Sequence, residues 1–142
     1  ILGAGGVVPS IIFALNKMKV SKITVCNRTK NKAENLKKLF NNITISEWGN
    51  VPNFDMIINA TSVGLNRTEK LNLDLSNVGQ NKIFYDVIYN PSETNFLETA
   101  RNKGNIAENG KKMFIYQARA AFKLWHGIEP EVNTELEKLL EK

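Results

Sequence analysis

Short apolar runs alternate with helix-like patterns along this chain. Six runs have the character of buried or edge strands, at residues 1–2, 23–26, 43–45, 56–58, 83–85 and 106–107. Five stretches space their apolar residues as a helix does, at residues 7–19, 31–40, 94–103, 112–125 and 130–140. This alternation predicts an α/β fold of the Rossmann-like, doubly wound kind, with a mainly parallel sheet and helices on both faces.

The first predicted strand is unusually short. Ile1 and Leu2 alone precede the first glycine, whereas a strand usually has about five or six residues. We therefore expect the sequence to be a piece of a longer polypeptide, cut inside or just before this strand. All 142 residues fit one domain of such a polypeptide.

Composition narrows the classes of function. The chain has 42% hydrophobic and 23% charged residues, which is typical of a folded domain. No apolar run approaches the roughly 18 residues that a membrane-spanning helix needs, so we expect no membrane partner. The one cysteine, Cys26, cannot form an internal disulfide and favours a reducing, cytoplasmic location. We expect Cys26 to be a buried strand residue.

The net charge of +5 has two interpretations, general solubility and an anionic partner. The basic residues are scattered over most of the chain, and no zinc-finger or RNP-type motif is present, so we do not expect nucleic acid. A phosphorylated small molecule suits the same charge.

A glycine-rich turn, Gly3-Ala4-Gly5-Gly6, joins the first strand to the first helix. Glycines at such a joint allow a tight turn and let backbone N–H groups approach a pyrophosphate at the helix N-terminus. The match to the dinucleotide motif G-x-G-x-x-G is imperfect, because Val8 holds the sixth position. A plain strand-to-helix turn is the alternative reading, and the end of the next strand helps to decide between the two.

That strand ends at Asn27-Arg28-Thr29. An NAD site usually places a carboxylate about 20 residues after the glycines, where it accepts from the ribose 2′-hydroxyl. Here the position has a guanidinium, which can form a charge-assisted fork with a 2′-phosphate. Lys30 and Lys32 add positive charge nearby. The pattern predicts NADP rather than NAD, and an ordinary solvated arginine is the alternative.

These motifs, with three later ones, resemble the C-terminal, cofactor-binding half of the shikimate dehydrogenase family over essentially the whole chain. The later motifs are Asn59-Ala60-Thr61-Ser62-Val63-Gly64-Leu65, then Asp86-Val87-Ile88-Tyr89-Asn90-Pro91 with Thr94, and Gly110 with Met113 and Gln117. The glycine turn and Asn27-Arg28-Thr29 are shared with other NADP enzymes, whereas the later three in this order are typical of the family.

The resemblance implies an NADP-dependent oxidoreductase that reversibly reduces 3-dehydroshikimate to shikimate, in the pathway to chorismate and the aromatic amino acids. It also implies four groups of residues: Gly3, Ala4, Gly5, Gly6 and Val7 at the pyrophosphate; Asn27, Arg28, Thr29 and Lys32 at the adenosine 2′-phosphate; Val87 and Gly110 at the nicotinamide; Tyr89 and Gln117 at shikimate or 3-dehydroshikimate.

The family's catalytic Lys–Asp pair belongs to an N-terminal substrate domain, and we find no replacement for it and no metal site in this sequence. The chain is therefore expected to be inactive alone. The helices at about 112–142 are implied to pack toward that domain. The chain is a possible homodimer. Two other functions are alternatives: a quinate/shikimate dehydrogenase and a non-catalytic NADP-binding module.

For three side chains, the sequence alone allows two interpretations each. Tyr89 is either a hydroxyl donor to a ligand or a half-buried packing aromatic. Gln117 lies beside an apolar face and needs a polar partner, which a substrate hydroxyl or a backbone carbonyl would supply. We expect Trp125 to be a packing residue rather than a stacking platform.

Overall fold

The computed structural model describes residues 1–140. Its helices are α1 (Val8–Lys17), α2 (Lys30–Leu39), α3 (Asn95–Asn102), α4 (Lys111–His126) and α5 (Thr134–Leu139). Its strands are β1 (Ile23–Cys26), β2 (Ile43–Ser46), β3 (Met56–Asn59), β4 (Ile83–Asp86) and β5 (Ile106–Glu108). Each of these elements was predicted from the sequence, and α5 alone departs from its prediction by more than two residues at one end.

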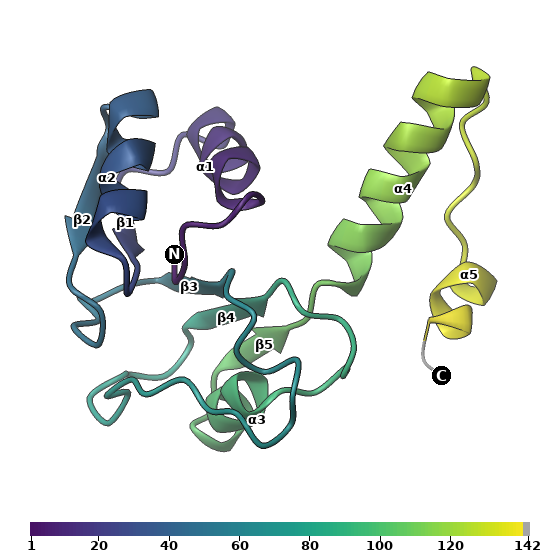
Figure 1. Ribbon diagram of the computed structural model, residues 1–142. Coiled ribbons are helices and arrows are strands. Elements are labelled where there is room, and N and C mark those ends of the chain that lie inside the picture. The colour runs from purple at the N-terminus through teal and green to yellow at the C-terminus, as the bar shows by residue number, and fades with distance from the viewer. Residues whose placement is uncertain (141–142) are drawn as a thin grey trace.

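The strands form a parallel sheet with the first two residues at its centre. β1 pairs with β2, and β4 pairs with both β3 and β5, always in parallel. Leu2 joins the two groups, because it pairs with Cys26 on β1 and with Asn59 on β3. Its N–H donates to the Ile58 carbonyl, and its carbonyl accepts from the Ala60 N–H, both at 2.8 Å. The order β2–β1–Leu2–β3–β4–β5 confirms the doubly wound arrangement (Figure 1).

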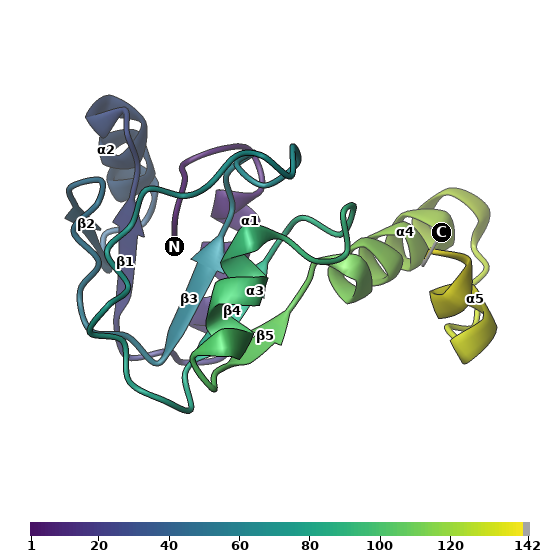
Figure 2. The ribbon, with the colours of Figure 1, turned by 90° about the horizontal axis from the view of Figure 1, so that it is seen from below.

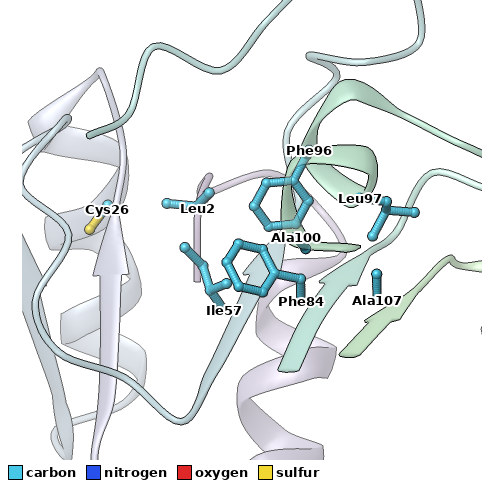
Figure 3. Close-up of a cluster of buried hydrophobic side chains, with 8 residues drawn as sticks. All are labelled: Leu2, Cys26, Ile57, Phe84, Phe96, Leu97, Ala100 and Ala107. Atoms are coloured by element: carbon cyan, nitrogen blue, oxygen red, sulfur yellow. The ribbon is translucent and has the colours of Figure 1, made fainter. Parts of the chain in front are cut away.

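Helices cover both faces of this sheet. α1 and α2 lie on one face and α3 lies on the other (Figures 1 and 2). The core under α1 and α2 consists of Val8, Ile12, Ile23, Val25, Ala33, Leu36, Ile43 and Ala60. The core under α3, drawn in Figure 3, consists of Leu2, Cys26, Ile57, Phe84, Phe96, Leu97, Ala100 and Ala107. The apolar strand residues therefore divide between two cores, and Cys26 is buried as predicted.

α3 begins and ends where its sequence predicts. The Thr94 hydroxyl accepts from the Leu97 N–H at 3.4 Å, which caps one of the free donors at the helix start. Gly104 follows the helix with φ of +73°, a left-handed conformation that glycine adopts without strain. Phe96 and Leu97 then point into the core beside Phe84, whose ring centroid lies 5.1 Å from that of Phe96.

The predicted helix at 130–140 is too long at its start. Residues 130–133 are not helical, and α5 begins after Asn133, whose side chain accepts from the Leu136 N–H at 3.0 Å. The preceding segment is held to α4 instead, because Arg119 donates to the Pro130 carbonyl at 3.0 Å and pairs with Glu129 at 2.8 Å. The Asn133 cap and these contacts with α4 therefore make the helix begin later than its apolar spacing predicts.

α4 projects away from the sheet (Figure 1). Ile115 is its buried residue, whereas Trp125 is 77% exposed. The expected packing of Trp125 therefore does not occur within the described part of this chain, because the C-terminal part of α4 has left the sheet. The exposed large apolar side chains on and after this helix are Phe114, Tyr116, Phe122, Leu124, Trp125, Ile128 and Leu139. No helix within residues 1–140 is long and apolar enough to cross a membrane.

Candidate cofactor-binding site

The strand order reverses beside Leu2. From this central position the chain passes first to β1 on one side, and later to β3 on the other. In open α/β sheets, ligands bind outside the carboxyl ends of the strands at such a reversal. The glycine turn, the loop after β1 and the loop after β3 all start at this edge, because the strands are parallel.

The glycines of the first turn serve two different needs. Gly3 has φ of +105°, and a Cβ on it would lie 2.8 Å from the Ala60 carbonyl oxygen. The fold itself therefore requires glycine there. A Cβ on Gly5 or Gly6 would meet nothing within 4 Å. Both residues are exposed, so the space above them is open to a ligand that approaches the backbone.

The N-terminus of α1 is open as well. Val7 precedes the helix without a side-chain cap, and the first turn holds no acidic residue. Within residues 1–140, the N–H groups of Gly5, Gly6 and Val7 donate to no backbone or side-chain acceptor. Free N–H groups and the positive end of the helix dipole suit an anion such as a pyrophosphate.

The loop after β1 presents its cations to solvent. The Asn27 side-chain amide donates to the Thr29 carbonyl at 2.8 Å, which closes a short turn around Arg28. Arg28 and Lys32 are exposed, and Arg28 takes part in none of the ion pairs within residues 1–140. The guanidinium is thus available to a ligand on the glycine turn, since Leu2 and Cys26 are paired neighbours.

The loops after β3 and β4 are joined by a buried polar network. Asn59 and Asp86 stand opposite each other in the parallel register, and both are 0% exposed. The Asn59 amide donates to Asp86 Oδ1 and to the Val63 carbonyl, each at 3.1 Å. Thr61 donates to Asn59 Oδ1 through its hydroxyl at 2.7 Å and through its N–H at 3.1 Å. The network fixes the first turn of the Thr61–Gly64 loop.

Asp86 extends the same network toward the next loop. Its Oδ1 also accepts from the Ile88 N–H at 3.0 Å, and its Oδ2 accepts from the Thr94 hydroxyl at 2.7 Å. Burial raises the pKa of the Asp86 carboxyl, and the hydrogen bonds from Ile88, Thr94 and Asn59 offset part of that rise. One carboxyl group thus links β3, the segment after β4 and the start of α3.

Val87 and Gly110, predicted together from the resemblance, are in contact. The Gly110 N–H donates to the Ile88 carbonyl at 3.1 Å. A Cβ on Gly110 would clash with the Val87 carbonyl group, with 2.6 Å to its carbon. The close contact between the Gly110 and Val87 backbones determines where α4 leaves the sheet, because Gly110 is the residue before that helix.

Alanine at Gly110 should therefore destabilise the chain by about 1–3 kcal/mol, the usual cost of overpacking. Alanine at Gly6 is the matched control and should change the free energy of unfolding by less than about 0.5 kcal/mol, because a Cβ there meets open space. Urea unfolding followed by circular dichroism measures both. Equal stability of the two variants would contradict the close packing at Gly110.

Tyr89 contacts α4 through Phe114, and no hydrogen bond links it to Gln117 within residues 1–140. Tyr89 is half-buried and stacks on Phe114, with ring centroids 4.6 Å apart and an interplanar angle of 23°. The Tyr89 ring therefore packs within this chain, and its hydroxyl makes no hydrogen bond within residues 1–140, so that it stays available to a ligand. Gln117 is exposed on α4, so solvent can satisfy its amide, and no substrate is needed for that purpose.

The sequence motifs include both Asn59 and Asp86, but the pairing of these two side chains was not predicted, although a signal exists. Each ends a strand of apolar residues, Met56–Ile58 and Ile83–Tyr85. A polar residue at the end of a buried strand needs partners, but the sequence does not say that the two strands are neighbours. The register supplies that information.

A cavity of about 560 Å³ lies at the opposite edge of the sheet, between the first residues of β1 and β3. It contains none of the predicted site residues. Within residues 1–140, no group of three or more His, Cys, Asp or Glu side chains is placed to hold a metal ion. The candidate site is therefore the edge with the glycine turn.

Comparison with known proteins gives two family matches. Residues 1–94 match the model described as shikimate/quinate 5-dehydrogenase, and residues 112–134 match the C-terminal domain of shikimate 5′-dehydrogenase. A shikimate dehydrogenase (NADP(+)) of Pelagibacter ubique is 55% identical over 99% of this chain and 53% of its own length. The chain thus spans about half the length of the curated relatives it matches.

Solved structures show the same fold. Shikimate 5-dehydrogenase of Thermus thermophilus, in complex with NADP(H) and shikimate, aligns with a TM-score of 0.80 and 29% identity, over 99% of this chain and 51% of that one. Quinate dehydrogenase of Corynebacterium glutamicum, in complex with NAD, aligns with a TM-score of 0.84 and 27% identity, over 99% and 51%.

Proposed function

This chain belongs to the shikimate/quinate dehydrogenase family, and on that premise we propose that it is the cofactor-binding part of an NADP-dependent shikimate dehydrogenase. Such an enzyme interconverts 3-dehydroshikimate and shikimate. The observation that carries the proposal is the pairing, at one sheet edge, of the open N-terminus of α1 with the unpaired Arg28 guanidinium. The names of the curated relatives support NADP as the cofactor.

The residues at this edge suit the parts of NADP in order. The pyrophosphate would bind at the turn of Gly3, Ala4, Gly5, Gly6 and Val7. The free N–H groups of Gly5, Gly6 and Val7 would donate to it, whereas the Gly3 N–H already donates to the Cys26 carbonyl at 2.7 Å. The adenosine 2′-phosphate would bind Asn27, Arg28, Thr29 and Lys32. The open space above Gly5 and Gly6 supports this fit, because the fold does not need glycine there and a pyrophosphate does. When bound, the nicotinamide supplies or accepts the hydride.

The other end of the site is assigned to the reacting groups. Val87 and Gly110 would border the nicotinamide. Their backbone contact supports this assignment, because it places both residues on one wall of the site. Tyr89 and Gln117 would face shikimate or 3-dehydroshikimate. Stacking on Phe114 holds the Tyr89 ring in place, so that its hydroxyl can donate to a substrate oxygen. Among residues 1–140, we find none positioned to protonate the alkoxide that hydride transfer creates.

The proton donor would come from an N-terminal substrate domain, joined to this domain of residues 1–142, of which residues 141 and 142 lie outside the described part. The helices from about 112 onward would pack toward that domain. The exposed apolar side chains of α4 support this assignment, since Leu124 and Trp125 are 84% and 77% exposed. The single buried cysteine supports a reducing, cytoplasmic location.

Two observations favour a second function. The matching family model covers quinate as well as shikimate dehydrogenases, and the structural neighbour from Corynebacterium glutamicum was solved with NAD. A quinate/shikimate dehydrogenase with an NAD preference would place a carboxylate, not Arg28, beside the adenosine ribose. The nucleotide preference therefore separates the two.

Calorimetric titration of this chain with NADP⁺ and with NAD⁺ tests the proposal. We expect NADP⁺ to bind at least about tenfold more tightly, because one charge-assisted fork contributes about 1.5–3 kcal/mol. The 2′-phosphate fragment 2′,5′-ADP is the matched control for the phosphate contact and should compete with NADP⁺. Equal affinities for the two dinucleotides would argue against the NADP assignment.

A further inference from the structure

Asp86 is a buried carboxylate whose partners are all neutral. It is 0% exposed, and its hydrogen-bond donors are an amide, a backbone N–H and a hydroxyl. None of the ion pairs within residues 1–140 includes it. Neutral donors satisfy the lone pairs of a carboxylate but do not cancel its net charge. Since little water screens a buried group, its field reaches further than that of a surface charge.

This charge lies at a defined place in the candidate site. Asp86 is the last residue of β4 and directly precedes Val87, whose carbonyl group touches Gly110. Lys82, directly before β4, pairs with Asp55 at 3.2 Å, and Lys111 and Lys112 lie at the start of α4. Lys112 is exposed and screened by solvent, and the Lys111 ammonium donates to the Glu137 carbonyl at 3.4 Å. Arg28 and Lys32 serve the opposite, adenosine end.

We propose that the Asp86 carboxylate makes this site favour the oxidised, cationic nicotinamide over the neutral reduced ring. The inference rests on the proposed function, which places the nicotinamide beside Val87 and Gly110. An oxidised nicotinamide carries one positive charge, whereas the reduced ring carries none. A fixed negative charge near the nicotinamide would therefore stabilise the oxidised state alone. Asp86 acts through space and touches no reacting atom, so it is a positioning and electrostatic residue.

The network also permits a substitution that removes the charge but keeps the shape. In Asp86→Asn, the remaining oxygen can still accept from Asn59 and Ile88. The new amide can donate to the Thr94 hydroxyl, which then accepts instead of donating. Thr94→Val is the matched control, because it removes one hydrogen bond from the same carboxylate and leaves the charge in place.

The experiment compares NADP⁺ and NADPH binding to the chain and to these two variants, at about pH 8, so that the Asp86 carboxyl is deprotonated although burial raises its pKa. Calorimetry gives Kd for both dinucleotides without turnover. In Asp86→Asn, we expect Kd for NADP⁺ to rise about three- to tenfold relative to Kd for NADPH, the effect of one buried charge near the ring. In Thr94→Val, both constants should shift together, because loop positioning affects both redox states alike.

The outcomes separate this inference from the function on which it rests. An unchanged Kd ratio in Asp86→Asn, with both dinucleotides still bound, would overturn the role of Asp86 and leave the proposed function standing. Failure of the unmodified chain to bind either dinucleotide would overturn both. Asp86→Ser, also uncharged, replaces Asp86→Asn if the latter does not fold by circular dichroism. If neither folds, Asp86 is a structural residue and the proposal is wrong.

Discussion

Replacing Arg28 with alanine should lower the affinity of the chain for NADP⁺ by about 10- to 100-fold. The guanidinium makes no ion pair within residues 1–140, so the substitution removes nothing that the fold uses. It removes a bidentate, charge-assisted contact with the 2′-phosphate, which contributes about 1.5–3 kcal/mol. NAD⁺ lacks that phosphate, and its affinity should change by less than about threefold.

The charge-reversed variant Arg28→Asp should go further. Its carboxylate would repel the 2′-phosphate and accept from a free ribose 2′-hydroxyl, so the preference should invert toward NAD⁺. Arg101→Ala is the control for net charge, because Arg101 pairs with Glu93 on the surface at 3.1 Å and lies on α3, far from the loop after β1. Calorimetric titration measures all three. An equal loss of NADP⁺ affinity in Arg101→Ala would reduce the Arg28 effect to a general charge effect.

The sequence predicts most of the fold because its strands are apolar runs and its helices are amphipathic. Ile57 and Phe84 are buried in the strands predicted for them, and Gly104 ends α3 as expected. The exposure of Trp125 and the late start of α5 have a common cause. Trp125 and the segment at 130–133 both lie beyond the sheet, where periodicity says that a face is apolar but not what it packs against.

Only part of the candidate site could be predicted, because local sequence shows where a strand ends but not which strand lies beside it. The position of Arg28 follows from the end of one strand, which local sequence reveals. The pairing of Asn59 with Asp86 depends on the register between two strands that are 27 residues apart in the chain, and nothing local specifies it. The glycine turn is an intermediate case: its sequence predicts a tight turn, but the structure is needed to separate Gly3, required by the fold, from Gly5 and Gly6, which are not.

The chain alone should reduce NADP⁺ with shikimate no faster than a blank. Hydride transfer from a hydroxyl-bearing carbon needs a base for the hydroxyl proton, and a positioned acid–base group contributes about 10²–10⁴ in rate. The side chains of the assigned substrate region, Tyr89 and Gln117, offer a phenol with no activating partner and an amide that does not titrate. Absorbance at the NADPH band, followed with excess NADP⁺ and shikimate, measures the rate.

Turnover should appear when the missing half is supplied. A chimera can join this chain to the remaining part of the Pelagibacter ubique relative, which is 55% identical over 99% of this chain. We expect its rate to exceed that of the chain alone by at least about 100-fold, because the upstream half would supply both the acid–base pair and the other wall of the substrate cleft. The upstream half by itself is the control and should be inactive, since it lacks the glycine turn and Arg28. Steady turnover by the isolated chain would instead mean that a residue within it performs the proton transfer, and Tyr89→Phe would then be the first variant to make.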